Sequence, residues 1–218
     1  MLPIDFELVE DEQGNEREGG YRYIDNCIAW CVENNLNLVL DLHKTAGYVF
    51  DDSAYSSDFF DNEALQERFI ALWLRLAGRY GKYHQNVAFE LLNEVVNPEA
   101  ADTWNKIAAH AIAKIREIAP DTWILVGGTR NNSIVSLKEL APPADKKIVF
   151  NFHCYEPLIF THQGAYWIDG MPLDYRMEYP LTVGACIDET KRLIDESFAY
   201  PIQEYADMMC GVQFFRSF

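Results

Sequence analysis

The chain has 218 residues, of which 49% are hydrophobic and 24% charged, so it can bury one substantial core, and a single domain over residues 1–218 is expected. Its 34 acidic residues outnumber its 18 basic residues and give a formal net charge of −16. Such a chain repels the phosphates of nucleic acids and of anionic membranes, which excludes both as expected partners and favours a neutral polymer such as a polysaccharide. No apolar run is long enough to span a bilayer, and the first residues do not form a signal peptide.

Short apolar runs alternate with longer amphipathic segments, which is typical of βα units around a parallel sheet. In chain order the pattern first predicts strands over 2–8 and 36–42, a helix over 63–80, a strand over 87–92, and a helix from Pro98 to about 119 with Asn97 as its N-cap. It then predicts a strand over 123–126, turns and a short helical stretch over 127–143, and a strand over 148–152. The rest of the chain is predicted as a long aromatic loop over 155–180, a mostly helical segment over 181–209 and a last strand over 212–215.

These predictions give about six strands separated by helices, whereas a (β/α)8 barrel has eight strands and about 250 residues. The chain is therefore either an open doubly wound sheet or a barrel that lacks part of its wall. Polar residues follow four of the predicted strands, and in a barrel the carboxyl ends of the strands converge on one mouth. They are His43, Asn93 with Glu94, Gly127 with Gly128, and His153 with Tyr155. The fold expected is an α/β fold, an incomplete (β/α)8 TIM barrel.

Glu94 is the first candidate catalytic residue, because it comes just after a buried strand and beside Asn93. Cleavage of a glycosidic bond with retention uses two carboxyl groups about 5 to 5.5 Å apart, of which one donates a proton to the leaving oxygen. Partial burial of Glu94 is expected to favour the protonated form that such an acid needs. The alternative is that the segment from Asn93 to Pro98 only caps the next helix, although Asn97 alone already supplies that cap.

The other candidate site residues are histidines and aromatic residues that can contact sugar hydroxyls or rings. His43 comes directly after the strand predicted over 36–42. His153 and Tyr155 are two residues apart at the end of another predicted strand, so their side chains point to the same face. Trp167, in the long aromatic loop, can act as a stacking platform or can simply pack that loop. The histidines can also be purely structural, or they can form a metal site together with Asp41.

Four segments carry a specific resemblance to a known family. They are Leu40-Asp41-Leu42-His43, Phe89-Glu90-Leu91-Leu92-Asn93-Glu94, Ile124-Leu125-Val126-Gly127-Gly128, and His153-Cys154-Tyr155 followed by Phe160-Thr161-His162-Gln163-Gly164-Ala165. In this order and spacing the chain resembles the glycoside hydrolase family 5 endoglucanases, from about residue 2 to residue 212.

The resemblance implies roles for individual residues. Glu94 is the acid/base, Asn93 and His43 contact the sugar at the cleavage point, and His153 and Tyr155 line the catalytic floor. The implied substrate is a β-1,4-glucan such as cellulose, with mannan or mixed-linkage glucan as alternatives. No cofactor and no metal are implied, and an extracellular location is expected because members of the family are usually exported.

The chain also departs from the family. The nucleophilic glutamate of the family follows the seventh strand, where this chain has Gly211-Val212-Gln213-Phe214-Phe215. Glu204 is the nearest upstream carboxylate, but it lies in a predicted helix. The first and eighth βα units are also expected to be missing.

These departures leave alternatives for the function. A barrel that lacks its first and last strands exposes two strand edges, so a homo-oligomer that covers them is expected. Three functions stay open, which are a working glucanase, a carbohydrate-binding remnant without the nucleophile, and a metal-dependent hydrolase.

Overall fold

The structure is a computed structural model that describes residues 1–50, 58–179, 182–194 and 202. It divides the chain into two compact units, Met1–His153 and Cys154–Phe218. The expectation of a single domain over residues 1–218 stays a prediction.

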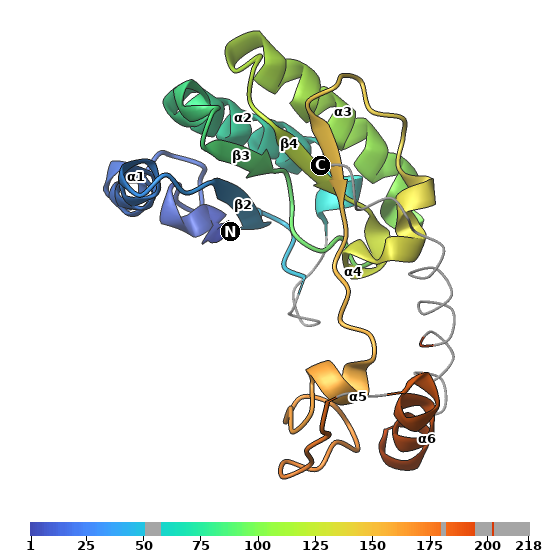
Figure 1. The fold of residues 1–218 in the computed structure, drawn as a ribbon. Helices are drawn as coiled ribbons and strands as arrows, with labels where there is room; N and C mark the ends of the chain where they lie inside the picture. The colour runs from blue at the N-terminus through green and yellow to red at the C-terminus, as the bar shows by residue number, and fades with distance from the viewer. Residues whose placement is uncertain (51–57, 180–181, 195–201, 203–218) are drawn as a thin grey trace. The chain divides into compact units, whose positions relative to one another are not determined.

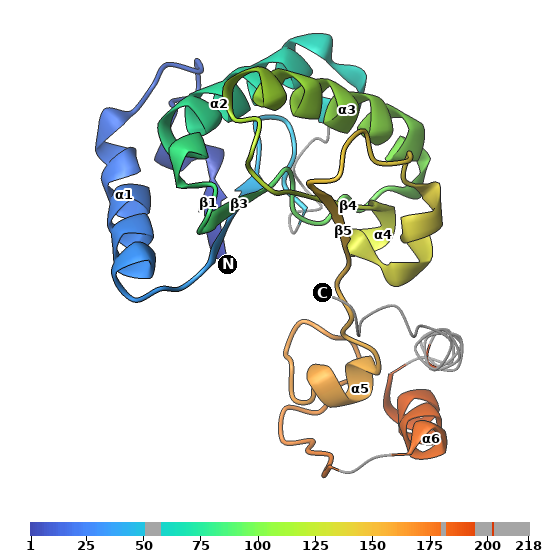
Figure 2. The same cartoon turned by 45° about the horizontal axis from the view of Figure 1, so that its top comes forward.

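The first unit contains a five-stranded parallel sheet in the order β1-β2-β3-β4-β5. Helices α1, α2 and α3 lie in an arc along one side of this sheet (Figures 1 and 2). The strands are β1 (Leu2–Asp5), β2 (Leu38–Lys44), β3 (Val87–Glu90), β4 (Ile124–Gly127) and β5 (Ile148–Asn151), and the helices are α1 (Glu18–Glu33), α2 (Glu63–Tyr80) and α3 (Ala101–Ile118). The prediction of an incomplete (β/α)8 barrel is confirmed, with strands and helices in strict alternation up to β4.

The main core lies between the sheet and the three helices. Trp73 of α2 and Phe89 of β3 are both fully buried, and their ring centroids lie 5.4 Å apart. Burying an aromatic side chain of this kind contributes about 1.5 to 3 kcal/mol. Since neighbouring side chains of a strand point to opposite faces, Glu90 points away from the helices, toward the inside of the barrel.

A row of four residues in register lies on this inner face. Asp41 pairs with Glu90, Glu90 pairs with Leu125, and Leu125 pairs with Val149. Two of the four are acidic and both are fully buried. The inner face of the sheet therefore carries two neighbouring buried carboxyl groups, those of Asp41 and Glu90.

Several predicted boundaries shift. The predicted strand over 2–8 ends at Asp5, because the register shifts after Ile4 and the chain turns into a 3-10 helix, η1 (Phe6–Leu8). Pro98 starts a 3-10 turn, η4 (Pro98–Ala100), before α3, and the side chain of Asn97 caps it by accepting a hydrogen bond from the backbone of Glu99 at 2.9 Å. The predicted helix over 63–80 coincides with α2, where Asn62 supplies the cap.

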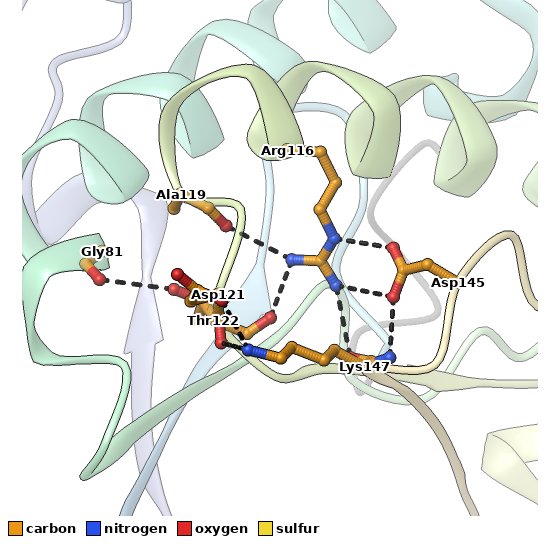
Figure 3. A network of polar contacts seen from close by, with 7 residues as sticks. All are labelled: Gly81, Arg116, Ala119, Asp121, Thr122, Asp145 and Lys147. Atoms are coloured by element: carbon orange, nitrogen blue, oxygen red, sulfur yellow. Dashed lines mark hydrogen bonds and ion pairs between the residues drawn. The ribbon is translucent and has the colours of Figure 1, made fainter.

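A polar network joins the C-terminal end of α3 to the starts of β4 and β5 (Figure 3). Arg116 donates to Asp145 Oδ2 at 2.7 Å and to the carbonyl oxygen of Thr122 at 2.7 Å, and Lys147 donates to Asp121 Oδ1 at 2.7 Å. These contacts lie at the amino ends of the strands. In a barrel that end contributes to stability, whereas chemistry takes place at the carboxyl ends.

The second unit has a small core of its own, formed by Ile159, Met171, Cys186 and Ile202. Its described helices are α5 (Leu158–Thr161) and α6 (Val183–Leu193). Helix α6 confirms part of the helical segment predicted over 181–209. The strand predicted over 212–215 lies outside the described residues, so five of the six predicted strands are described.

Candidate active site

Glu94 lies four residues after the end of β3, with a backbone φ of +43°, which is uncommon for a residue with a side chain. Its carbonyl oxygen accepts a hydrogen bond from the hydroxyl of Tyr48 at 2.7 Å, and the same hydroxyl accepts one from the backbone N–H of Val96 at 2.8 Å. Tyr48 is 3% exposed, and burial raises its pKa to about 12. The phenol therefore stays protonated and fixes the backbone on both sides of Val95.

The carboxyl group of Glu94 is held at both oxygens. His153 Nδ1 lies 2.6 Å from Glu94 Oε1, and the side-chain amide of Asn131 donates to Glu94 Oε2 at 3.2 Å. The side chains of Glu94 and His153 are 15% and 18% exposed. The carboxyl group is thus oriented but still reachable from solvent.

The protonation of Glu94 differs from the sequence-based expectation. Burial acts to raise the pKa of Glu94, as expected, but the hydrogen bonds from His153 and Asn131 and the charges of His153 and His43 together outweigh burial and lower the pKa. The hydrogen bond to Glu94 in turn raises the pKa of His153. The expectation of a protonated Glu94 is wrong for this arrangement, which favours a carboxylate beside an imidazolium.

Asn131 comes from a left-handed turn after β4, within α4 (Thr129–Asn132). Arg130, Asn131 and Asn132 have φ values of +55°, +58° and +54°. Asparagine tolerates this conformation better than most residues, because its short polar side chain can bond locally. Strained backbone of this kind gathers at functional sites.

Backbone contacts hold the left-handed turn beside Glu94. The N–H of Asn131 donates to the carbonyl oxygen of Val95 at 3.1 Å, and the N–H of His153 donates to the carbonyl oxygen of Asn132 at 2.8 Å. A Cβ on Gly127 would lie 2.2 Å from the side chain of Asn132, so only glycine fits there. This explains why a glycine, Gly127, ends β4.

At the same end of the sheet as Glu94, two buried acidic residues, Asp41 and Glu90, each form a short hydrogen bond. His43 Nδ1 lies 2.7 Å from Asp41 Oδ2, and the amide of Asn151 donates to Glu90 Oε1 at 2.6 Å. The hydrogen bond to Asp41 raises the pKa of His43. Burial, followed by the nearby charge of Asp41, raises the pKa of Glu90 to about 7.

The first unit brings together four of the predicted site residues, which are His43, Asn93, Glu94 and His153. Asn93 is 2% exposed, and its backbone N–H donates to the carbonyl oxygen of Leu42 at 3.1 Å, so it belongs to the same end of the sheet. The side chain of His43 is 30% exposed and packs edge-on against Phe50.

Tyr155 and Trp167, the remaining predicted site residues, belong to the second unit. They are 51% and 64% exposed, and His162 lies between them, 5.3 Å and 6.3 Å away between ring centroids. Tyr166 packs against Trp167 at 4.9 Å. The unit thus presents a group of exposed rings of the kind that stack on sugars.

Asn131, Asn151 and Glu90 also belong to the site and were not predicted from the sequence. Glu90 and Asn151 lie near the carboxyl ends of the strands predicted over 87–92 and 148–152, so the rule that selected Glu94 could have found them. No sequence signal marks the left-handed turn that places Asn131 beside Glu94. Within the described residues, no group of three or more His, Cys, Asp or Glu side chains is arranged to hold a metal ion. Asp41 and His43, which were weighed as ligands, bond to each other instead.

Comparison with known proteins identifies the family. The family described as "Cellulase (glycosyl hydrolase family 5)" matches residues 2–208. This chain therefore belongs to glycosyl hydrolase family 5. In (β/α)8 barrel enzymes the catalytic residues lie at the carboxyl ends of the strands, which is where Glu94 lies.

Curated relatives and solved structures agree with this assignment. The chain is 46% identical over 178 residues to cellodextrinase A of Ruminococcus flavefaciens, which covers 82% of this chain and 53% of the relative. It is 43% identical over 182 residues to endoglucanase C of Acetivibrio thermocellus, with 82% and 52% covered. Cel5A of Thermotoga maritima, solved with cellobiose, is similar with a TM-score of 0.64 and 27% identity, over 77% of this chain and 55% of that one. The chain thus spans about half the length of the curated relatives it matches.

Proposed function

We propose that this chain carries the acid/base half of a retaining β-1,4-glucanase, with Glu94 as the general acid/base. The observation that carries the proposal is the geometry of Glu94, whose two carboxyl oxygens are held by His153 and Asn131 after a barrel strand. The names of the relatives, a cellodextrinase and an endoglucanase, support a β-1,4-glucan as the substrate. The similar Cel5A was solved with cellobiose and with mannotriose, which keeps mannan as an alternative.

In this function the imidazolium of His153 passes its Nδ1 proton to Glu94 Oε1, 2.6 Å away, and Glu94 donates it to the leaving oxygen. In the second step Glu94, again a carboxylate, acts as a base and activates water. His153 holds the group between these steps and stabilises its charged form. In the first unit, His43 and Asn93 are proposed to contact hydroxyls of the sugar at the cleavage point. In the second unit, Tyr155 and Trp167 are proposed as sugar-binding residues because their rings are exposed. The nucleophilic carboxylate is not assigned to a residue, because the segment where the family has it reads Gly211-Val212-Gln213-Phe214-Phe215, without a glutamate. The proposal therefore takes the nucleophile from another carboxylate of the chain or from a neighbouring subunit.

The test is turnover of an aryl β-cellobioside and of carboxymethylcellulose by the purified chain, with Glu94→Gln and Glu94→Ala. Loss of a general acid lowers turnover by about 10² to 10⁴. The loss is expected to be larger on cellulose than on an aryl glycoside, whose leaving group needs little protonation. Added azide should restore turnover of the aryl glycoside by Glu94→Ala, since it attacks the glycosyl-enzyme without a base.

A control variant separates catalysis from general damage. Glu33→Gln removes one exposed carboxylate at the end of α1 and should leave turnover unchanged. Equal turnover of the unaltered protein and Glu94→Gln would contradict the assignment of Glu94. Sugar binding without hydrolysis at any pH would instead favour the carbohydrate-binding alternative.

We further propose that copies of the chain associate into a homo-oligomer along strand edges. In the described sheet, β1 and β5 are the two end strands, and each pairs with one neighbour only. Unpaired strand edges favour association with another chain. Light scattering coupled to gel filtration should give a mass of at least twice the chain, and a stable monomer at micromolar concentration would contradict this.

We propose an extracellular location, since a polymeric glucan is met outside the cell. Within the described residues, no helix is both long and apolar enough to cross a membrane. The measurement is fractionation of the native culture followed by detection with a specific antibody. Protein found only in the cell fraction would contradict the proposal.

A further inference from the structure

Asp41 and Glu90 are two acidic residues side by side inside the barrel. They are paired in register on neighbouring parallel strands, β2 and β3, and both are 0% exposed. Their side chains point to the same face of the sheet. Two ionised carboxylates on neighbouring strands in a buried site repel each other, and the charge of Asp41 acts to raise the pKa of Glu90.

The hydrogen bonds of this pair leave one oxygen of each residue without a partner. Asp41 Oδ2 is bonded to His43, and Glu90 Oε1 accepts from Asn151. Among the described residues, no group forms a hydrogen bond with Asp41 Oδ1 or Glu90 Oε2, and both atoms are buried. A buried polar atom without a partner costs about 1 to 3 kcal/mol. A single proton between these two oxygens would satisfy both.

We propose that Glu90 is a positioning residue that carries this proton on Oε2 and donates it in a hydrogen bond to Asp41 Oδ1. Asp41 is thereby held at both oxygens, by Glu90 and by His43. The proton belongs on Glu90 rather than Asp41, because Asp41 already has an imidazole that can neutralise it, whereas the partner of Glu90 is the uncharged amide of Asn151.

The surrounding charges favour the same assignment. The groups that act on Glu90 are Asp41 and His43 from β2 and His153 from just beyond β5, in addition to the amide of Asn151. Burial and the charge of Asp41 outweigh Asn151 and the two histidines, and together they raise the pKa of Glu90 to about 7. Glu94 is held by its own partners, and Asp5 of β1 acts on His43.

The hydrogen bond from Glu90 has a consequence for His43. With Asp41 fixed as an acceptor, His43 keeps its proton on Nδ1, so its Nε2 side is left to face a sugar hydroxyl. This last step rests on the proposed function, whereas the shared proton does not. The two can therefore be tested separately.

The first experiment follows the free energy of unfolding of the full chain by urea titration from pH 4.5 to pH 8. Because the pKa of Glu90 is raised in the folded chain from 4.5 to about 7, its contribution to stability is complete below pH 4.5 and is lost as the pH rises to about 7. Glu90→Gln imitates the protonated acid, since its amide can donate to Asp41 and its oxygen can accept from Asn151.

We expect the unfolding equilibrium constant of Glu90→Gln, relative to that of the unaltered protein, to fall on the order of a hundredfold across this interval. Glu90→Met, which fills the space but cannot donate, should be less stable than Glu90→Gln at every pH. Glu33→Gln, the exposed control, should follow the unaltered protein. A constant ratio between Glu90→Gln and the unaltered protein, with the variant always less stable, would overturn the proposal.

The second experiment detects the proton directly. The infrared difference spectrum between the unaltered protein and Glu90→Gln at pH 6 should contain the C=O stretch of a buried, protonated carboxylic acid. This band should be lost as the pH rises above about 7. A spectrum that shows only carboxylate bands at pH 6 would overturn the proposal.

The third experiment concerns His43 and uses binding of cellotetraose, measured by calorimetry. Glu90→Met should weaken binding about fivefold or more, and Glu90→Gln should weaken it less, because it keeps the donor to Asp41. Equal weakening by the two variants would overturn the positioning role. If the unaltered protein binds no cellotetraose, the proposed function fails, while the unfolding and infrared experiments still decide the protonation of Glu90.

Discussion

At the scale of single residues, the two oxygens of the Glu94 carboxyl group have neighbours of different chemistry. His153 can gain or lose a proton near neutral pH, whereas the amide of Asn131 cannot. One neighbour therefore makes the charge of Glu94 depend on pH, and the other only fixes its direction. Each can be removed separately.

Replacing His153 by Gln should change how stability depends on pH. The pKa of Glu94 is lowered in the folded chain, so its contribution to stability is present above about pH 4.5 and is lost as the pH falls. The pKa of His153 is raised, so its contribution to stability is present below about pH 6.5 and is lost as the pH rises. The pair therefore stabilises most between these values. We expect His153→Gln to cost about 1.5 to 3 kcal/mol there, measured by urea unfolding.

The control for this prediction is His110→Gln. His110 is also near a glutamate, Glu67, but the two side chains are 47% and 68% exposed and 3.9 Å apart. Such a pair contributes about 0 to 1 kcal/mol. Similar losses from the two variants would contradict a special role for the pair of His153 and Glu94.

Replacing Asn131 by Ala should raise the pKa of Glu94, because one of the hydrogen bonds that stabilise its charged form is lost. Asn131→Asp should raise it further, by placing a second negative charge beside the first. The measurement is the pH titration of the Glu94 side-chain carboxyl carbon by ¹³C NMR. Asn34→Ala, which removes an amide at the end of α1, is the control and should leave this titration unchanged. An unchanged titration in Asn131→Ala would show that the contact is not made in solution.

How much of the site could be predicted from sequence is clearest for Glu94 and Asn131. Glu94 follows an apolar strand and has a family motif around it, so pattern alone located it. The contact of Asn131 depends on three consecutive left-handed residues, and a local pattern of Thr-Arg-Asn-Asn does not predict that conformation. The direction of the pKa shift of Glu94 was missed because it depends on partners from three other strand ends, those of β2, β4 and β5.

At the scale of elements, strands and helices were predicted where their periodicity is strong. Helix α2 was predicted to the residue, because its apolar side chains repeat at helical spacing and Asn62 caps it. The predicted strand over 2–8 was too long, since hydrophobicity does not reveal the register shift after Ile4. Helix α1 was not among the predicted elements, because exposed Tyr23 and Trp30 add apolar residues outside its buried face and blur its periodicity.

The network around Arg116 gives a prediction at this scale (Figure 3). Arg116→Ala should lower the free energy of unfolding by about 1 to 3 kcal/mol, since it leaves the carbonyl oxygen of Thr122 and the carboxylate of Asp145 without this donor. Lys114→Ala, on the same helix, breaks an exposed pair with Glu117 and should cost less than about 0.5 kcal/mol. Oligosaccharide binding should be unchanged in Arg116→Ala, and weakened binding would contradict the separation of the two ends of the sheet.

At the scale of the whole molecule, the dominant feature is the excess of negative charge. A net charge of −16 destabilises a compact chain through self-repulsion, which salt screens. We expect the melting temperature to rise by a few degrees when NaCl is increased from low salt to about 0.15 M, where the Debye length is about 8 Å. Differential scanning fluorimetry measures this. A lower melting temperature in salt would mean that attractive ion pairs outweigh the repulsion.

The left-handed turn after β4 also limits which amino-acid substitutions the chain can accept there during evolution. Positive φ is unfavourable for a residue with a side chain, and glycine relieves that strain. Selection for stability alone would accept glycine at Arg130 and at Asn131 alike. Selection for the chemistry of Glu94 would accept it only at Arg130, because glycine at position 131 removes the amide that Glu94 requires. Position 131 is therefore where a thermostable variant and an active one are expected to diverge.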